Sequence, residues 1–170
     1  MKVPNVAIVG RPNVGKSTIF NKLIGKKVSI IEDTPGVTRD RIYGTVTYNN
    51  YKFHLIDTGG IDVSKEDFNN EIIIQANIAI EEAETILFVV DGLEELNQND
   101  YLIRDILMKS GKRTILVVNK LDNTKREENI YNYYELGFEE VIGVSGEHSL
   151  GLNDLLDIIT KDFKEISETE

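Results

Sequence analysis

The chain reads Gly10-Arg11-Pro12-Asn13-Val14-Gly15-Lys16-Ser17 between an apolar run at residues 6–9 and a helical pattern that begins at Thr18. These eight residues match the phosphate-binding loop pattern G-x-x-x-x-G-K-[ST] at every fixed position. A loop flanked by glycines can turn its backbone N–H groups inward around a polyphosphate, and the following helix adds free N–H groups and the positive end of its dipole. We therefore predict that residues 10–18 bind the phosphate chain of a nucleotide.

Two side chains of this loop have separate predicted roles. The Lys16 ammonium is expected to reach the outer phosphates as a point charge, and the Ser17 hydroxyl is expected to ligate a Mg²⁺ ion held by the same phosphates. A glycine-rich turn that binds no ligand is the alternative, and the strand and helix patterns on either side disfavour it.

Length and composition indicate one globular domain. A chain of 170 residues can bury roughly 70% of the surface that its unfolded form exposes. Hydrophobic residues make up 41% of the chain, and no apolar run approaches the ~20 residues of a membrane span. The absence of cysteine excludes disulfides, and the net charge of -10 argues against direct nucleic-acid binding by a broad basic face. Because the start of the chain lacks the hydrophobic region of a signal peptide, we expect a cytoplasmic protein without membrane contacts.

Hydrophobic patterns along the rest of the chain alternate between strands and helices. The expected strands are residues 3–9, 43–48, 52–57, 85–91, 114–119 and 141–144. The expected helices are residues 16–25, 68–83, 98–110 and 124–136, and then a last helix with the apolar stripe Leu152, Leu155, Leu156, Ile159 and Phe163. Residues 26–42 are expected to form a loop. The alternation predicts an α/β fold, with a mostly parallel six-stranded sheet, one antiparallel edge strand and helices on both faces.

Four polar or glycine-rich signals follow directly after expected strands. They begin at Gly10, Asp57, Asn119 and Ser145. Ligands of such sheets bind at the carboxyl ends of the strands. We therefore expect the four signals to meet at one edge of the sheet.

The second signal reads Asp57-Thr58-Gly59-Gly60. Its position places a carboxylate near the phosphates, where Asp57 is expected to hold Mg²⁺ through water and the Gly60 N–H to sense the γ-phosphate. An aspartate that only caps a turn is the alternative reading, and the preceding strand and upstream phosphate loop favour the functional one.

The third signal, Asn119-Lys120-Leu121-Asp122, is expected to select the base. The Asp122 carboxylate can accept two hydrogen bonds from the ring N–H and the exocyclic amine of guanine, whereas adenine offers no such pair. Asn119 is expected to tie this segment to the phosphate loop, and the Lys120 stem to lie against the base plane.

The fourth signal, Ser145-Gly146-Glu147, follows the last expected strand. Its backbone N–H groups are expected to bind the guanine carbonyl oxygen. A plain polar turn is the alternative.

In this order, the motifs resemble those of the translation-factor-related GTPases. More narrowly, four stretches resemble the first GTPase domain of the bacterial Der (EngA) family. They are residues 10–17, 57–60 and 119–122, and Thr34-Pro35-Gly36-Val37-Thr38-Arg39-Asp40-Arg41. The resemblance implies a P-loop GTPase fold at residues 1–163, with residues 164–170 as the start of an acidic interdomain linker. It also implies a full-length protein with a second GTPase domain and a KH-like domain. That full-length protein is expected to assist assembly of the large ribosomal subunit.

The resemblance also implies roles for single residues. A threonine must close on Mg²⁺ and the γ-phosphate; Thr34 and Thr38 both qualify chemically, and the resemblance favours Thr38. Asn13 matches the asparagine with which potassium-activated relatives hold K⁺, and the alternative is a hydrogen bond within its own turn. Ile61 stands where many GTPases carry the glutamine that orients the attacking water, and an aliphatic side chain cannot do so.

The expected function is therefore that of a switch domain that binds GTP and hydrolyses it slowly in isolation. Mg²⁺ and K⁺ are its expected cofactors, and catalytic roles are expected for Lys16, Thr38, Gly60 and Asn13. A regulatory module that holds GDP or GTP with negligible turnover is an alternative. A small-molecule phosphotransferase built on the same loop is another, but it lacks an arginine-rich lid segment and leaves residues 119–122 unexplained.

Overall fold

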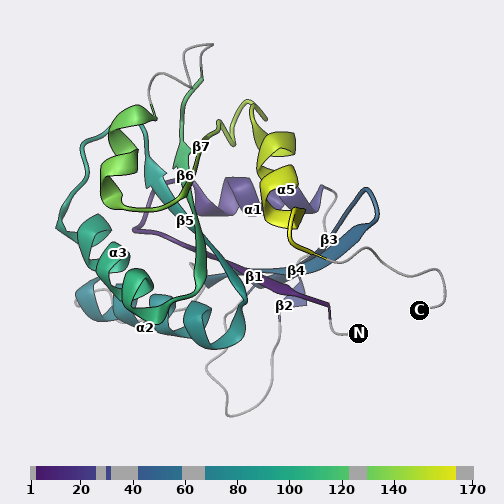
Figure 1. Ribbon diagram of the computed structural model, residues 1–170, viewed down its shortest axis with the longest axis horizontal. Coiled ribbons are helices and arrows are strands. Elements are labelled where there is room, and N and C mark those ends of the chain that lie inside the picture. Colours follow the sequence, from purple (N-terminus) through teal and green to yellow (C-terminus); the bar gives the residue numbers. More distant parts are fainter. Residues whose placement is uncertain (1–2, 26–29, 32–41, 59–67, 123–129, 164–170) are drawn as a thin grey trace.

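The computed structural model describes residues 3–25, 30–31, 42–58, 68–122 and 130–163. Its strands form one sheet in the order β2-β3-β4-β1-β5-β6-β7 (Figure 1). The strands are β1 (Asn5–Val9), β2 (Ile30–Ile31), β3 (Ile42–Tyr48), β4 (Tyr51–Asp57), β5 (Thr85–Asp91), β6 (Arg113–Asn119) and β7 (Glu140–Gly143). β1 is parallel to β4 and β5, β6 is parallel to β5 and β7, and β3 is antiparallel to both β2 and β4.

The six expected strands and the antiparallel hairpin are confirmed, but the prediction that residues 26–42 form a loop is wrong at one place. Ile30 and Ile31 form the short strand β2, which pairs with Ile42 and Tyr43 of β3. Two adjacent β-branched residues favour extended backbone, but two residues are too few to show the alternation that identifies a strand. The antiparallel strand β3 is therefore second from the edge of the sheet.

Helices cover both faces of the sheet, as expected. α1 (Lys16–Ile24) and α5 (Leu152–Thr160) lie on one face, and α2 (Phe68–Glu82) and α3 (Gln98–Ser110) lie on the other (Figure 1). Successive residues of β5 alternate between the two cores: Leu87 and Val89 pack in the α1/α5 core, while Phe88 packs in the α2/α3 core. Because both faces are buried, the central strands are continuously hydrophobic in sequence.

The helix expected at residues 124–136 needs correction. Residues 123–129 lie outside the described part of the chain, and Tyr131–Leu136 forms the 3₁₀ helix η2, which ends at Gly137 with a φ of 95°. Aromatic residues and asparagine, which fill most of this segment, are weak α-helix formers. Leu136 is buried and packs in the α2/α3 core.

The last helix is shorter than its apolar stripe suggests. α5 ends at Thr160, and Phe163 lies beyond it. The Phe163 ring packs edge-on against the Phe53 ring of β4, with 5.9 Å between the ring centroids. The apolar side chain therefore extends the core without extending the helix.

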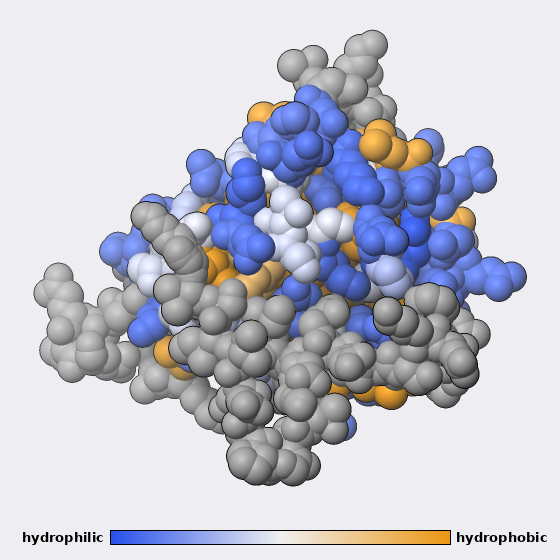
Figure 2. Space-filling model, turned by 180° about the vertical axis from the view of Figure 1, so that it is seen from behind, coloured by the Kyte–Doolittle hydropathy of each residue, from blue (hydrophilic) through white to orange (hydrophobic). Residues whose placement is uncertain are grey.

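The surface of the described residues is mostly polar. On the face shown in Figure 2, hydrophilic residues cover most of the described area, and hydrophobic residues appear in small separate areas. None of the helices that the structure describes combines the length and the hydrophobicity needed to cross a bilayer.

Candidate functional site

The phosphate loop connects β1 to α1 and depends on two glycines for its shape. A Cβ atom on Gly10 would lie 2.6 Å from the carbonyl oxygen of Val89. Gly15 has a φ of 98°, and a Cβ there would collide with the Asn119 side chain. Both positions therefore exclude side chains for physical reasons, since one has no space and the other also needs left-handed backbone.

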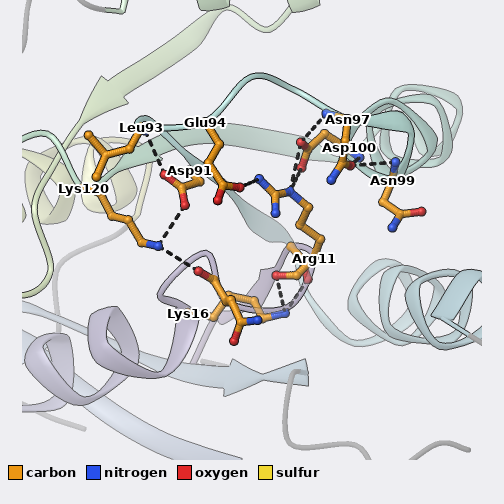
Figure 3. Close-up of polar contacts among 11 residues, drawn as sticks. Arg11, Lys16, Asp91, Leu93, Glu94, Asn97, Asn99, Asp100 and Lys120 are labelled. Carbon is orange, nitrogen blue, oxygen red and sulfur yellow. Dashed lines mark hydrogen bonds and ion pairs between the residues drawn. The ribbon is translucent and has the colours of Figure 1, made fainter. Parts of the chain in front are cut away.

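The Lys16 side chain lies inside this loop and is only 8% exposed. Its Nζ atom donates to the carbonyl oxygens of Gly10 and Arg11 (Figure 3). Burial lowers the pKa of Lys16, and the negative charges of Asp57 and Glu71 partly oppose this shift. An ammonium group has three donors, so a phosphate oxygen entering the loop can accept the remaining one and stabilise the charged form.

A cavity of about 350 Å³ opens beside the loop. It is lined by Pro12, Asn13, Gly15, Lys16, Ser17, Thr18, Glu71 and Gln75. The Ser17 hydroxyl donates to Asp57 Oδ2 over 3.2 Å, so the two expected Mg²⁺ ligands already lie together at the ends of β4 and the phosphate loop. Hydroxyl and carboxylate oxygens suit this hard cation, so the residues present fit Mg²⁺.

The Thr58 side chain has a structural role, unlike the neighbouring Asp57. It is fully buried, and its hydroxyl donates to the carbonyl oxygen of Ile8 over 2.7 Å. This hydrogen bond holds the end of β4 against β1. Thr58 therefore secures the position of Asp57, and its own side chain points into the protein.

Asn119 joins the phosphate loop to the expected base-binding segments, as the sequence predicts. Its Nδ2 atom donates to the carbonyl oxygen of Val14 over 2.8 Å, and its Oδ1 atom accepts from the Gly146 N–H over 2.9 Å. The Asn119 residue is 3% exposed, so both hydrogen bonds are shielded from water. One amide thus sets the spacing between two segments that are distant in sequence.

The Asp122 carboxylate lies at the same edge and is about half exposed. The buried Ser145 hydroxyl donates to Asp122 Oδ1 over 2.8 Å, and His148 Nε2 lies 3.8 Å from Asp122 Oδ2. The Ser145 hydroxyl also accepts from the His148 N–H over 3.2 Å. Ser145 therefore orients the carboxylate while leaving it accessible.

The backbone of the fourth motif differs from the expectation in one respect. The Ser145 N–H donates to the Leu150 carbonyl oxygen, and the Gly146 N–H donates to Asn119. Two of the N–H groups expected to face the guanine carbonyl oxygen are thus engaged within the protein. The Leu150 partner belongs to a local turn, whereas the Asn119 partner is brought close by the tertiary fold and is not visible in the sequence.

Comparison with known proteins agrees with this geometry. A family model described as 50S ribosome-binding GTPase matches residues 5–120. The chain belongs to this GTPase family. GTPases of the family generally use Mg²⁺, in agreement with the Ser17 and Asp57 oxygens.

The curated relatives of this GTPase domain are longer proteins. The chain is 52% identical to GTPase Der of Staphylococcus saprophyticus over 165 residues, which is 97% of this chain and 38% of the relative. It is also 52% identical to GTPase Der of Staphylococcus aureus strain JH9 over 168 residues, with 99% and 38% covered. The chain therefore spans about 38% of the length of these relatives. These matches confirm the resemblance to the Der family.

Solved structures share the fold. A structure of Aquifex aeolicus Era bound to GDP and AlF4⁻ superposes with a TM-score of 0.76 and 33% identity, covering 98% of this chain and 59% of that one. The FeoB G-domain of Methanococcus jannaschii superposes with a TM-score of 0.67 and 28% identity, covering 95% and 97%. The P-loop GTPase fold is thus confirmed.

Lys120 connects the base-binding edge of this GTPase domain to a residue that sequence reasoning missed. Its Nζ atom donates to the Asn13 carbonyl oxygen over 3.0 Å and to Asp91 Oδ2 over 2.8 Å (Figure 3). Asp91 ends β5, and its other carboxylate oxygen accepts from the Leu93 N–H. The same rule that selected Asp57, a carboxylate directly after a buried strand, could have found Asp91.

Arg11 is directed from the phosphate loop toward the start of α3. Its Nε atom donates to the Asp100 carboxylate over 3.2 Å, and its Nη2 atom donates to Glu94 over 2.9 Å (Figure 3). Burial alone lowers the pKa of Arg11, but hydrogen bonds and charge from Glu94 and Asp100 outweigh it and raise the pKa. Asp100 also completes a capping box with Asn97, a pattern that is visible in sequence. The Arg11 guanidinium is therefore neutralised within the protein.

Other predicted site residues lie outside the described part of the chain. These are Thr34, Thr38, Gly59, Gly60 and Ile61. Their roles stay predictions.

Proposed function

We propose that this chain is a GTP-binding switch domain that hydrolyses GTP to GDP and phosphate. The observation that carries the proposal is the pair of hydrogen bonds made by the Asn119 amide, one to the phosphate loop and one to the Ser145–Glu147 segment beside Asp122. A ligand that spans this edge of the sheet meets phosphate-binding groups at one end and a carboxylate suited to guanine at the other.

The proposed roles within the site rest on the sequence motifs and, for the described residues, on the contacts given above. The loop at residues 10–18 is proposed to bind the phosphates, with Lys16 and the Gly60 N–H on the outer ones. Ser17, Asp57 and Thr38 are proposed to hold Mg²⁺, which neutralises charge on the β- and γ-phosphates. The Asp122 carboxylate and the Glu147 N–H are proposed to bind the guanine edge, with the Lys120 stem against the base plane.

Nucleotide titration followed by single-turnover hydrolysis tests the proposal. We expect the domain to bind GTP and GDP at least a hundredfold more tightly than ATP, on the order of 3 kcal/mol, because adenine leaves Asp122 unpaired. Bound GTP should convert to GDP within the lifetime of the complex. Equal affinity for ATP would contradict the base assignment, and stable bound GTP would favour the regulatory module without turnover.

Potassium dependence is a further part of the proposal. Asn13 lines the phosphate cavity and has left-handed backbone with a φ of 69°. Its side-chain carbonyl oxygen is a suitable K⁺ ligand, and a cation there would stabilise charge that develops on the bridging oxygen during hydrolysis.

We expect faster hydrolysis in potassium chloride than in sodium chloride at equal ionic strength. The Asn13→Ala variant should lose the difference and keep its GDP affinity. Equal rates in both salts for the unmutated domain would contradict the K⁺ assignment.

The place of this domain in a longer protein is also proposed. By similarity to GTPase Der, we propose that residues 1–163 form the GTPase domain and that residues 164–170 begin an acidic linker. The full-length protein is proposed to act in the cytoplasm with a second GTPase domain and a KH-like domain, and to assist large-subunit assembly. Sedimentation of the full-length protein with large ribosomal subunits, in GTP against GDP, tests this role.

A further inference from the structure

Helix α2 places two polar side chains on the wall of the phosphate cavity. Glu71 and Gln75 line this cavity together with Lys16, Ser17 and Thr18. The two residues are four positions apart, so they lie on the same face of α2. Gln75 Nε2 donates to Glu71 Oε1 over 3.3 Å. The phosphate loop and the Glu71 carboxylate thus line the same cavity, and the Gln75 amide donates a hydrogen bond to that carboxylate.

The burial of Gln75 restricts the orientation of the Glu71 carboxylate. The residue is 4% exposed, so its amide is largely shielded from water. A buried amide that gives an N–H to a carboxylate fixes the orientation of that carboxylate, because breaking the bond leaves an unsatisfied polar group. Gln75 is therefore placed to hold Glu71 toward the cavity.

The reaction proposed above needs a group of this kind. An attacking water must be oriented toward the γ-phosphorus by a hydrogen-bond acceptor. Ile61, at the usual glutamine position, carries only an aliphatic side chain and cannot accept a hydrogen bond. Among the residues that line the cavity, Glu71 supplies the carboxylate acceptor, and its charge acts on the Lys16 ammonium of the phosphate loop.

We propose that Glu71 is the catalytic residue that orients the attacking water, and that Gln75 is its positioning residue. This inference rests on the proposed GTP hydrolysis. The water oxygen forms a bond to the γ-phosphorus while the bond from that phosphorus to the β–γ bridging oxygen breaks. The bridging oxygen leaves with the bond electrons as part of GDP, and the water proton passes to the Glu71 carboxylate and from there to the phosphate product.

Single-turnover hydrolysis of GTP already bound to the domain tests this role separately from binding. We expect Glu71→Gln to slow conversion by about 10²- to 10⁴-fold, the range for loss of a general base. Affinity for GDP and GTP should stay equal or rise, because the variant removes a negative charge facing the phosphates. Glu71→Asp should recover part of the rate, since it keeps the carboxylate.

Two further variants separate this role from a structural one. Gln75→Leu keeps a side chain of similar size but frees Glu71, so it should slow hydrolysis by about tenfold with GTP affinity retained. Glu81→Gln is the matched control, because Glu81 is an exposed acid on the same helix away from the cavity. It should hydrolyse GTP at the unmutated rate.

The outcomes distinguish this inference from the proposed function. An unmutated domain that hydrolyses GTP, together with an equally fast Glu71→Gln variant, would overturn the role of Glu71 and leave the function intact. A slow Glu71→Gln variant with parallel loss of GDP affinity would also overturn it, because the effect would then be structural. An unmutated domain that binds GTP without turnover would overturn the hydrolytic function and this inference together.

Discussion

The phosphate pocket and the base-binding edge of this domain are built in different ways. The phosphate pocket comes mainly from the contiguous loop at residues 10–18, whose backbone shape depends on its glycines. The base-binding edge is assembled by hydrogen bonds between residues 105, 27 and 23 positions apart in sequence, from Asn119 to Val14, Gly146 to Asn119 and Ser145 to Asp122. One pocket is therefore largely local, and the other exists only after the sheet has formed.

Asn119 belongs to both pockets, so its removal should have the largest effect. Asn119→Ala leaves the buried Val14 carbonyl and Gly146 N–H without partners, which should lower the free energy of unfolding by about 2–5 kcal/mol and weaken GTP binding. Urea unfolding and titration with a fluorescent GTP analogue measure the two effects. The exposed Asn132 gives the control Asn132→Ala, and loss of stability with unchanged affinity would show that the pockets are independent.

The second variant concerns the local pocket alone. Lys16→Ala removes a charged donor to the phosphates and should weaken GTP binding by about 3 kcal/mol, or roughly a hundredfold. The fold should survive, because burial already lowers the pKa of Lys16 and the ammonium is not a stabilising core group. Circular dichroism checks the fold beside the titration, with the exposed Lys109→Ala as control. An unfolded spectrum would show that Lys16 is structural.

The third variant concerns the base-binding edge alone. Asp122→Asn should weaken GTP binding by about 2 kcal/mol and shift preference toward xanthosine triphosphate, because an amide can donate to the carbonyl that xanthine adds. Competition between the two nucleotides measures the shift. Asp105→Asn, on the exposed side of α3, should leave GTP preference unchanged. A retained GTP preference in Asp122→Asn would refute the base assignment.

The smallest effect on binding is expected at Arg11, although it lies within the phosphate motif. Arg11→Ala should lower the free energy of unfolding by about 1–2 kcal/mol, because it leaves the buried Asp100 carboxylate with fewer partners, and should change GTP affinity less than about threefold. Arg104→Ala removes a more exposed ion pair with Asp105 and should cost about 0–1 kcal/mol. Strong loss of GTP affinity in Arg11→Ala would show that its guanidinium reaches the nucleotide.

The site could be predicted from sequence wherever a motif is contiguous or follows a strand. Gly15 needs left-handed backbone, whereas Gly10 is required by the neighbouring Val89 carbonyl of β5. Both glycines belong to one contiguous motif, so the pattern is visible in the sequence without the fold. Asp57 and Asn119 were found because strand ends share one edge of a parallel sheet. The same rule applies to Asp91 at the end of β5. The 3₁₀ helix η2 replaces the expected α-helix because its aromatic residues and asparagine are weak α-helix formers, while Gly137 ends both.

The sequence by itself determined the alternation of strands and helices, the phosphate loop and the chemistry able to select guanine. Local backbone preferences and hydrophobic periods carry that information along the chain. Only the tertiary structure decided that Arg11 pairs with α3, that Lys120 pairs with Asp91, and that Glu71 and Gln75 line the phosphate cavity. Those pairings depend on which helix packs on which face of the sheet. Contacts between side chains far apart in sequence produce no periodic pattern of residues from which they could be predicted.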